Sequence, residues 1–410
     1  MSDSRKNERL LLAAVFLFWF SVYTYPSFLT DYVVNTLGAT KVLAGTIVGS
    51  YGFTQMALRI PLGIISDVVK KRKLFVMLGF GMSILASAGF VLVAQMTGAN
   101  MPGWLPYAAL IFRGMAGMTA ATWVNFSVLY SASYKAEDIP AAMSRIVVPQ
   151  CGSQVVAMLL GAQLAGYLGE TYAFLLATLG GLMGLIVMSR VKEQPPVGDP
   201  MTIRGLIEVA KDRDLILGTA LATIYQLVAW ATVQGFVQNW AREVICLTTA
   251  ELGYLSVANL LPTTLISRLS GDILTRKFGR RTVLASGFVC MAIACCLYPL
   301  TNSLFTLILV QALFGCGVGL IMPLTMACAI QNIPDARRGA AMGIYQAVYG
   351  LGMFLGPVIA GAVIDAFSVT TPGNSAGAVP GYVANFIVAA AIALAGGIVA
   401  VVLTRKAAKK

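Results

Sequence analysis

The chain of 410 residues is 58% hydrophobic and only 11% charged, and its mean hydropathy is +0.79. Soluble proteins carry about 25% charged residues, so a soluble enzyme, a coiled coil, a disordered protein and a nucleic-acid binder are all poor interpretations. The net charge of +12 comes from short basic clusters between apolar runs, as in the loops on one side of a membrane protein. The chain has no histidine, and its seven cysteines lack the Cys-x-x-Cys spacing of a metal site. We therefore expect a membrane protein with no metal, no cofactor and no disulfide framework.

Apolar runs long enough to cross a membrane recur along the whole chain. A spanning helix needs about 20 such residues. The first run is too long for a signal peptide and no small-residue cleavage site follows it, so we interpret it as a retained helix. The sequence predicts twelve spans: Leu10–Val34, Val42–Ser66, Leu74–Gln95, Leu105–Tyr130, Ala142–Tyr167, Thr171–Ser189, Leu215–Ala241, Ala250–Leu274, Thr282–Leu300, Leu304–Ile330, Gly339–Ala366 and Tyr382–Leu403.

The placement of lysine and arginine predicts the orientation of these spans. Of the 29 basic residues, only Lys41 and Arg242 fall on the side opposite the termini, and Arg59, Arg113 and Arg268 fall within spans. All others lie in the tails and in the loops on the side of the termini. Because basic loops stay in the cytosol, we expect both termini to be cytosolic.

A polar segment in the middle of the chain separates six spans from the other six. Residues 191–213 begin with the stiff sequence Val-Lys-Glu-Gln-Pro-Pro and end with apolar residues at helical spacing. The second part predicts a short amphipathic helix on the inner membrane surface, with Ile203, Leu206, Ile207 and Ala210 on its apolar face. We expect one six-helix bundle in residues 1–190, a linker in 191–213 and a second bundle in 214–410.

The two halves carry related loops, each reading arginine, glycine, carboxylate and then a basic cluster. In the first half these are Arg59, Gly63, Asp67 and Lys71-Arg72-Lys73; in the second they are Arg268, Gly271, Asp272 and, after Gly279, Arg280 and Arg281. Two parallel six-helix repeats with a site at their interface are a transporter arrangement.

Over its whole length the chain resembles the major facilitator superfamily. The resemblance rests on Gly63-x-x-x-Asp67 with its basic cluster and on Arg113-Gly-x-x-Gly117 in the fourth span, although Lys70 stands where the family has a loop glycine. It implies an all-α membrane protein with 12 transmembrane helices, arranged as two six-helix bundles related by pseudo-two-fold symmetry. It also implies a secondary transporter, usually monomeric, and not an enzyme.

The three arginines inside the spans are candidates for substrate contact. None of the 17 acidic residues falls near the membrane midplane, and a buried arginine without a partner marks a functional site by default. Arg59 lies eight residues from Asp67, about 12 Å into the membrane, and we expect Arg268 at a similar depth in the other half. Two such guanidinium groups suit an oxyanion, but either one could instead be a strut of the inner gate. Arg113 matches a family motif that is linked to proton coupling or helix packing, so its role is also open.

Polar and aromatic side chains occur in the helices that line the central cavity of the superfamily. Such groups orient a small organic ligand on an apolar wall, although any single one could pack in the core or face lipid. The candidates are Trp19, Tyr23, Trp123, Asn125, Gln154, Gln226, Trp230, Tyr345, Gln346 and Tyr349.

A second group of residues is expected to control the inner gate. It comprises Gly63, Asp67, Arg72, Asp272, Gly279 and Arg280, and we expect Gly63 and Gly271 to allow close helix contact. Asp31, near the outer end of the first span, is the best candidate for coupling to a proton.

The sequence thus predicts a multi-pass protein of the cytoplasmic membrane that moves a small organic solute, an organic anion or metabolite, by alternating access. The alternative is a proton-coupled efflux antiporter for drugs or amphiphiles, which the aromatic residues favour and the missing deep acid disfavours. We expect no nucleic-acid partner.

Overall fold

The computed structural model describes residues 2–98, 100–132, 134, 139–193, 203–334, 337–368 and 375–404, and within these ranges the chain is helical and contains no strand. The N-terminal half comprises α1 (Ser2–Tyr23), α2 (Pro26–Asp31), the π-helix η1 (Tyr32–Thr36), α3 (Lys41–Val69), α4 (Arg72–Gln95), α5 (Leu105–Ala121), α6 (Trp123–Ser131), α7 (Ile139–Tyr167) and α8 (Glu170–Ser189). A short helix, α9 (Ile203–Ala210), follows the linker, of which residues 194–202 lie outside the described ranges.

The C-terminal half repeats this plan. It comprises α10 (Arg213–Ala231), the π-helix η3 (Thr232–Phe236), α11 (Val237–Glu243), α12 (Thr249–Leu269), the π-helix η4 (Ser270–Leu274), α13 (Thr275–Phe278), α14 (Arg280–Leu297), the 3₁₀-helices η5 (Tyr298–Leu300) and η7 (Ser375–Ala378), α15 (Leu304–Ile330), α16 (Arg338–Phe367) and α17 (Val379–Thr404).

Local sequence explains where several helices begin and break. The first span breaks before Pro26, which opens α2 at a position where its missing N–H costs nothing. The α12 helix starts with a capping box, in which Thr248 and Glu251 satisfy each other's backbone N–H groups. The predicted span Leu105–Tyr130 is interrupted at Thr122, which separates α5 from α6.

Nine helical segments in the described ranges are long and apolar enough to cross a membrane. They account for nine of the twelve predicted spans. The other three are also helical, as α3, α5 with α6, and α12. Of these, α5 alone has 17 residues and is short for a span of about 20, because of the break at Thr122.

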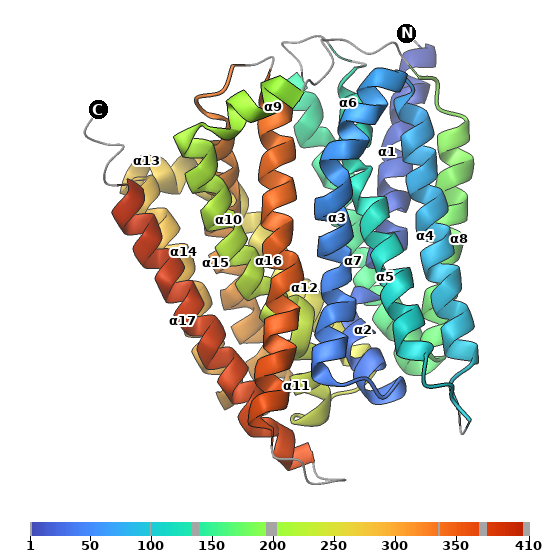
Figure 1. Cartoon of the computed structure of the whole chain (residues 1–410), viewed down its shortest axis with the longest axis vertical. Coiled ribbons are helices and arrows are strands. Elements are labelled where there is room, and N and C mark those ends of the chain that lie inside the picture. The colour runs from blue at the N-terminus through green and yellow to red at the C-terminus, as the bar shows by residue number, and fades with distance from the viewer. Residues whose placement is uncertain are drawn as a thin grey trace.

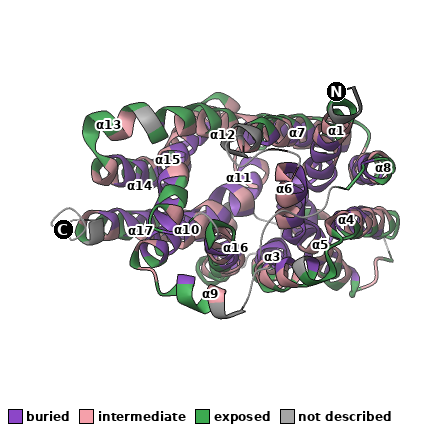
Figure 2. Cartoon of the chain, turned by 90° about the horizontal axis from the view of Figure 1, so that it is seen from above, coloured by how far each residue is buried: buried purple, intermediate pink, exposed green. Residues whose placement is uncertain are grey.

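The helices stand side by side in two groups, with the start of α1, the helix α9 and the end of α17 at the same end of the molecule (Figures 1 and 2). We call this the α9 end and the opposite one the α11 end. The halves meet where α3 packs on α16, α7 on α12, and α2 on α11. The described ends of α1 and α17 therefore lie at the same end of the molecule, as the sequence predicts.

The two halves pack most closely toward the α11 end. A Cβ at Gly45 would lie 2.0 Å from the carbonyl oxygen of Pro357, and one at Gly361 would lie 2.2 Å from the carbonyl oxygen of Lys41. Such distances are possible only without a side chain, so these glycines allow backbone-to-backbone contact between α3 and α16. Gly52 meets Met353 in the same way.

Glycines nearer the α9 end make no such contact. Apart from the backbone of its own helix and its chain neighbours, no described atom lies within 4 Å of where a Cβ would be at Gly63, Gly152, Gly271, Gly339 or Gly343. The expectation that Gly63 and Gly271 allow close helix contact is therefore wrong in this form, because the helices diverge at that depth. The two halves are therefore in close contact at the α11 end and are separated at the depth of these glycines.

Candidate functional site

A small cavity lies between the two halves. Its volume is about 10 Å³, which is roughly the space for one water molecule. Helices of both halves contribute its lining, which consists of Val22, Tyr23, Pro26, Tyr51, Arg113, Trp230 and Gln234.

Arg113 is the charged residue of this cavity. It is 3% exposed, and its Cζ lies 4.5 Å from the centre of the Tyr51 ring and 5.6 Å from that of Tyr25. These cation–π contacts offset part of the cost of burying the charge. Its Nε and Nη1 have no hydrogen-bond partner, and it makes no ion pair with any described carboxylate. Arg113 therefore has unused donors and an uncompensated positive charge, and it lies in the wall of the cavity.

An aromatic stack next to Arg113 joins the two halves. Tyr51 of α3 stacks on Trp230 of α10, with ring centres 5.5 Å apart and planes 16° apart. The hydroxyl of Tyr51 also contacts that of Tyr23. The Tyr51 ring thus contacts both the guanidinium of its own half and the Trp230 ring of the other half.

Arg59 also lies between the halves and is 2% exposed. It donates through Nη1 to Oε1 of Gln346 on α16 and through Nη2 to the carbonyl of Ala120, 3.0 Å away. The helix breaks two residues later, where the N–H of Thr122 bonds back to Thr119 and the regular ladder stops. A carbonyl at such a break lacks its usual partner four residues on, and Arg59 supplies a donor to it.

Unpaired buried side-chain atoms in four helices of the N-terminal half are mostly donors. In α1, α3, α5 and α6, the described buried side-chain atoms without a partner include one acceptor, Oε1 of Gln55, and five donors. A site with this excess of N–H groups favours a ligand rich in acceptors, such as a carboxylate or phosphate. The donor atoms are Trp19 Nε1, Arg59 Nε, Arg113 Nε and Nη1, and Asn125 Nδ2.

The predicted aromatic residues divide between the cavity and the packed core. Trp19 contacts Tyr23 and Trp123, with ring centres 5.6 and 5.1 Å apart, and so extends the aromatic wall from Tyr23. Tyr345 is buried against Tyr349, 5.3 Å away, and its hydroxyl hydrogen-bonds that of Thr325, so its environment is that of a packing residue. Gln154 and Gln226 are half-buried and are not among the residues lining the cavity.

Arg268 does not join the other two arginines. It is exposed, lies in the last turn of α12 and makes no hydrogen bond or ion pair with the described residues. The prediction that Arg59 and Arg268 occupy matching depths assumes a continuous α-helix. The chain changes to the π-helix η4 directly after Leu269 and continues as α13, so the matching depth of the two arginines stays a prediction.

None of the predicted gate and coupling residues is among the described residues that line the cavity. The side chains of Asp67 and Asp272 are not described. Gly279 has φ +78° in the turn between α13 and α14, and Arg280 donates to Gln331, 2.6 Å away. Asp31, the coupling candidate, lies at the α11 end and pairs with Arg242.

Several residues of the site escaped the sequence analysis, above all Tyr51 and the polar contacts at the α11 end. A signal for Tyr51 exists, because it lies eight residues before Arg59 and therefore near the same face of one helix. Within the described ranges, no group of three or more histidine, cysteine or acidic residues could hold a metal ion.

The sequence model of the Major Facilitator Superfamily matches residues 11–237 and 215–410, so both halves of the chain are covered. The chain belongs to the major facilitator superfamily. Over 372 residues it is 23% identical to an uncharacterized MFS-type transporter of Methanocaldococcus jannaschii, covering 87% of this chain and 92% of that protein. A shorter segment of 115 residues is 32% identical to the multidrug transporter protein MdtP of Bacillus subtilis, covering 28% and 21%.

Solved structures of this superfamily share the fold. A bacterial homologue of the human lysosomal transporter Spinster, in an inward-facing and unoccupied conformation, superposes with a TM-score of 0.78 at 15% identity, covering 98% of this chain and 97% of that one. The nucleoside transporter NupG gives a TM-score of 0.73 at 14% identity, with coverage of 97% and 99%. The chain is therefore a multi-pass MFS transporter with an all-helical fold.

Proposed function

We propose that this MFS transporter moves a small organic anion across the cytoplasmic membrane by a rocker-switch mechanism. The observation that carries the proposal is Arg113, a buried arginine at an inter-half cavity with unused donors and no described acidic partner. A buried positive charge without a partner is costly, and an anionic ligand would relieve that cost.

The alternating movement is supported by the way the halves meet. They pack backbone to backbone near Gly45 and Gly361 at the α11 end and stand apart near Gly63 and Gly343. With the basic α9 end in the cytosol, this form would be closed to the outside. A rocking movement of the two halves about the cavity would separate Tyr51 from Trp230 and would make Arg113 accessible from the outer side of the membrane.

Arg59 would respond to the same movement, because its partner Gln346 belongs to the other half. The amide oxygen of Gln346 occupies an acceptor position on the guanidinium that a carboxylate oxygen could take. Arg59 therefore has two possible roles that transport assays can separate, a substrate contact and a strut between halves.

The test is a thermal-shift screen of the purified protein in detergent, with a panel of small carboxylates and phosphorylated metabolites against a panel of lipophilic cations. A ligand at about 100 times its Kd should stabilise the fold by about 2.7 kcal/mol. We expect shifts only with anions, lost in Arg113→Gln and kept in the control Arg145→Gln, which removes the same charge from an exposed side chain. Shifts with cations alone, or anion binding that survives Arg113→Gln, would overturn the proposal.

A proton-coupled multidrug efflux antiporter is the second candidate. The aromatic wall formed by Trp19, Tyr23 and Trp123 supports it, as does the local similarity to the multidrug transporter of Bacillus subtilis. In that case Asp31→Asn should abolish drug resistance in cells. Unchanged resistance would remove this candidate.

A further inference from the structure

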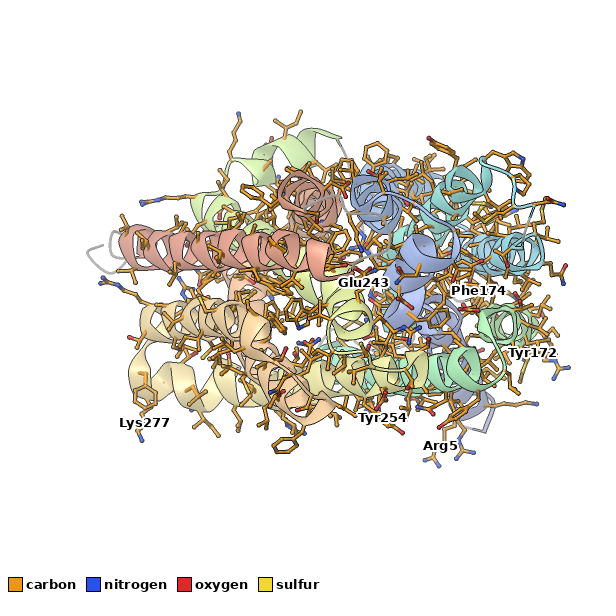
Figure 3. All side chains as sticks on the ribbon, turned by 90° about the horizontal axis from the view of Figure 1, so that it is seen from below. Arg5, Tyr172, Phe174, Glu243, Tyr254 and Lys277 are labelled. Atoms are coloured by element: carbon orange, nitrogen blue, oxygen red, sulfur yellow. The ribbon has the colours of Figure 1, made fainter. Side chains whose placement is uncertain are left out.

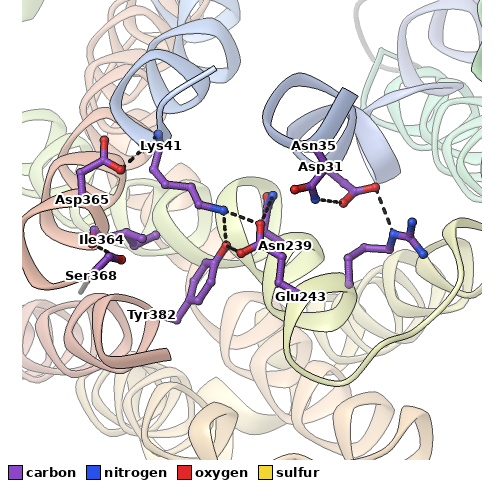
Figure 4. A network of polar contacts seen from close by, with 10 residues as sticks. Asp31, Asn35, Lys41, Asn239, Glu243, Ile364, Asp365, Ser368 and Tyr382 are labelled. Atoms are coloured by element: carbon purple, nitrogen blue, oxygen red, sulfur yellow. Dashed lines mark hydrogen bonds and ion pairs between the residues drawn. The ribbon is translucent and has the colours of Figure 1, made fainter. Parts of the chain in front are cut away.

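A network of polar contacts joins the two halves at the α11 end (Figure 4). Lys41 of α3 forms an ion pair with Glu243 of α11 and donates to the hydroxyl of Tyr382, 2.6 Å away. That hydroxyl donates in turn to the second carboxylate oxygen of Glu243, at 2.8 Å. The ion-paired side chains are only 13% and 14% exposed, so water screens them weakly. Glu243 lies near the middle of this end of the molecule (Figure 3).

The same lysine is also held through its backbone. Asp365 of α16 accepts hydrogen bonds from the N–H groups of Lys41, at 3.3 Å, and Val42, at 2.9 Å. These are the first residues of α3, whose unpaired N–H groups and dipole favour a carboxylate. A residue of the C-terminal half thus caps a helix of the N-terminal half.

A second ion pair lies beside the first. Arg242, the neighbour of Glu243, donates through Nε to Asp31 of α2, 3.2 Å away, and through Nη1 to the carbonyl of Leu247, 2.6 Å away. Asp31 is held in turn by Asn35, at 2.6 Å. Consecutive residues of α11 therefore offer opposite charges to two partners in the other half. Because the signs alternate, shifting α11 by one residue would place like charges together.

We infer that Lys41, Glu243, Arg242 and Asp31 are positioning residues that hold the transporter closed at the α11 end. The inference rests on the proposed function in that it takes the two halves to alternate. The pairs cannot survive opening, since each joins one half to the other. Outward opening exposes all four groups to water, which restores their hydration, so the pairs delay opening without preventing it.

This arrangement makes a specific prediction for single and double variants. Lys41→Met leaves Glu243 buried without its cation, and Glu243→Gln leaves Lys41 without its anion; an uncompensated buried charge costs more than an absent pair. Each single variant should therefore shift the protein toward the open form. The double variant Lys41→Met/Glu243→Gln should shift it less than either, because no charge is left stranded.

The test measures access to a reporter cysteine in the full-length chain. Val48→Cys, placed in a background without the seven native cysteines, lies buried on α3 in the cluster around Tyr51 and Trp230. A membrane-impermeant maleimide added to intact cells should label it slowly in the parent and roughly tenfold faster in each single variant, because a buried charge is stranded there. The double variant should fall between the parent and the single variants.

The control is the pair Arg337 and Glu208 at the α9 end, whose side chains are 50% and 43% exposed. Arg337→Met and Glu208→Gln should leave the labelling rate unchanged. Where a variant of the Lys41–Glu243 pair fails to fold, Arg242→Gln supplies a second test, in which labelling should rise because Asp31 is left buried without its cation. Labelling that stays at the parental rate in Arg242→Gln, or effects in the double variant that equal the sum of the single ones, would overturn the inference.

The two proposals fail in different ways. Labelling needs no substrate, so loss of anion binding in the Arg113 test leaves the labelling result at Val48→Cys intact. If the single variants label no faster than the parent while anions still stabilise the protein through Arg113, the positioning role is refuted and the anion site stands.

Discussion

Replacing Gly45 by alanine adds one methyl group at the closest contact between the halves. Its Cβ would lie 2.0 Å from the carbonyl oxygen of Pro357, against at least 3.4 Å for an ordinary contact. The two helices must therefore separate locally by about 1.4 Å. The obstacle is backbone, which cannot rotate away as a side chain would. Overpacking of this kind costs about 1–3 kcal/mol, more than the roughly 1 kcal/mol that alanine gains over glycine in a helix.

The matched control is Gly343→Ala on the facing helix α16, where no described atom lies within 4 Å of the added Cβ. We expect the control to melt at or above the temperature of the parent, and Gly45→Ala to melt below it, in detergent. Outward opening would relieve the clash, so Gly45→Ala should also label faster at Val48→Cys. If Gly45→Ala melts as high as Gly343→Ala and labels no faster, the close contact between α3 and α16 is wrong.

Three further substitutions test separate features. Trp230→Leu removes the ring stacked on Tyr51 and should lower stability by about 0.5–1.5 kcal/mol beyond the lost area, seen as earlier melting; an unchanged melting curve would contradict the stack. Lys70→Gly relieves a left-handed residue at φ +56° and should raise stability by about 1 kcal/mol, whereas Lys70→Ala should not. Arg337→Ala breaks an exposed pair with Glu208 and should cost at most about 1 kcal/mol in denaturation; a larger loss would mean that this pair anchors α9.

The spans were predictable because apolar length alone decides them. The sequence predicts Thr171–Ser189 and Leu304–Ile330, and the helices are Glu170–Ser189 and Leu304–Ile330. The break at Thr122 was not predictable, since the run from Leu105 to Tyr130 contains no internal proline after its first turn. At this break the backbone carbonyl of Ala120 accepts a hydrogen bond from Arg59, a residue of another helix, and no pattern within the run reveals that contact.

The candidate site was predictable in part. The absence of acidic residues at mid-depth pointed correctly to buried arginines at positions 59 and 113. Arg268 is exposed where Arg59 and Arg113 are buried, and its role as a matching arginine stays a prediction. The contacts at the α11 end could not be predicted from the sequence, since Lys41 and Glu243 lie 202 residues apart in the chain.

The break between α5 and α6 also predicts how the sequence should vary among homologues. Arg59 donates to the carbonyl of Ala120, which lies just before the interruption at Thr122. In a continuous helix that carbonyl would accept a hydrogen bond from the backbone, and Arg59 would lose it as an acceptor. Replacing the arginine would leave the carbonyl without this donor. The two positions should therefore covary among homologues: chains that keep an arginine at position 59 should keep the break, and chains with a continuous helix should carry a different residue there.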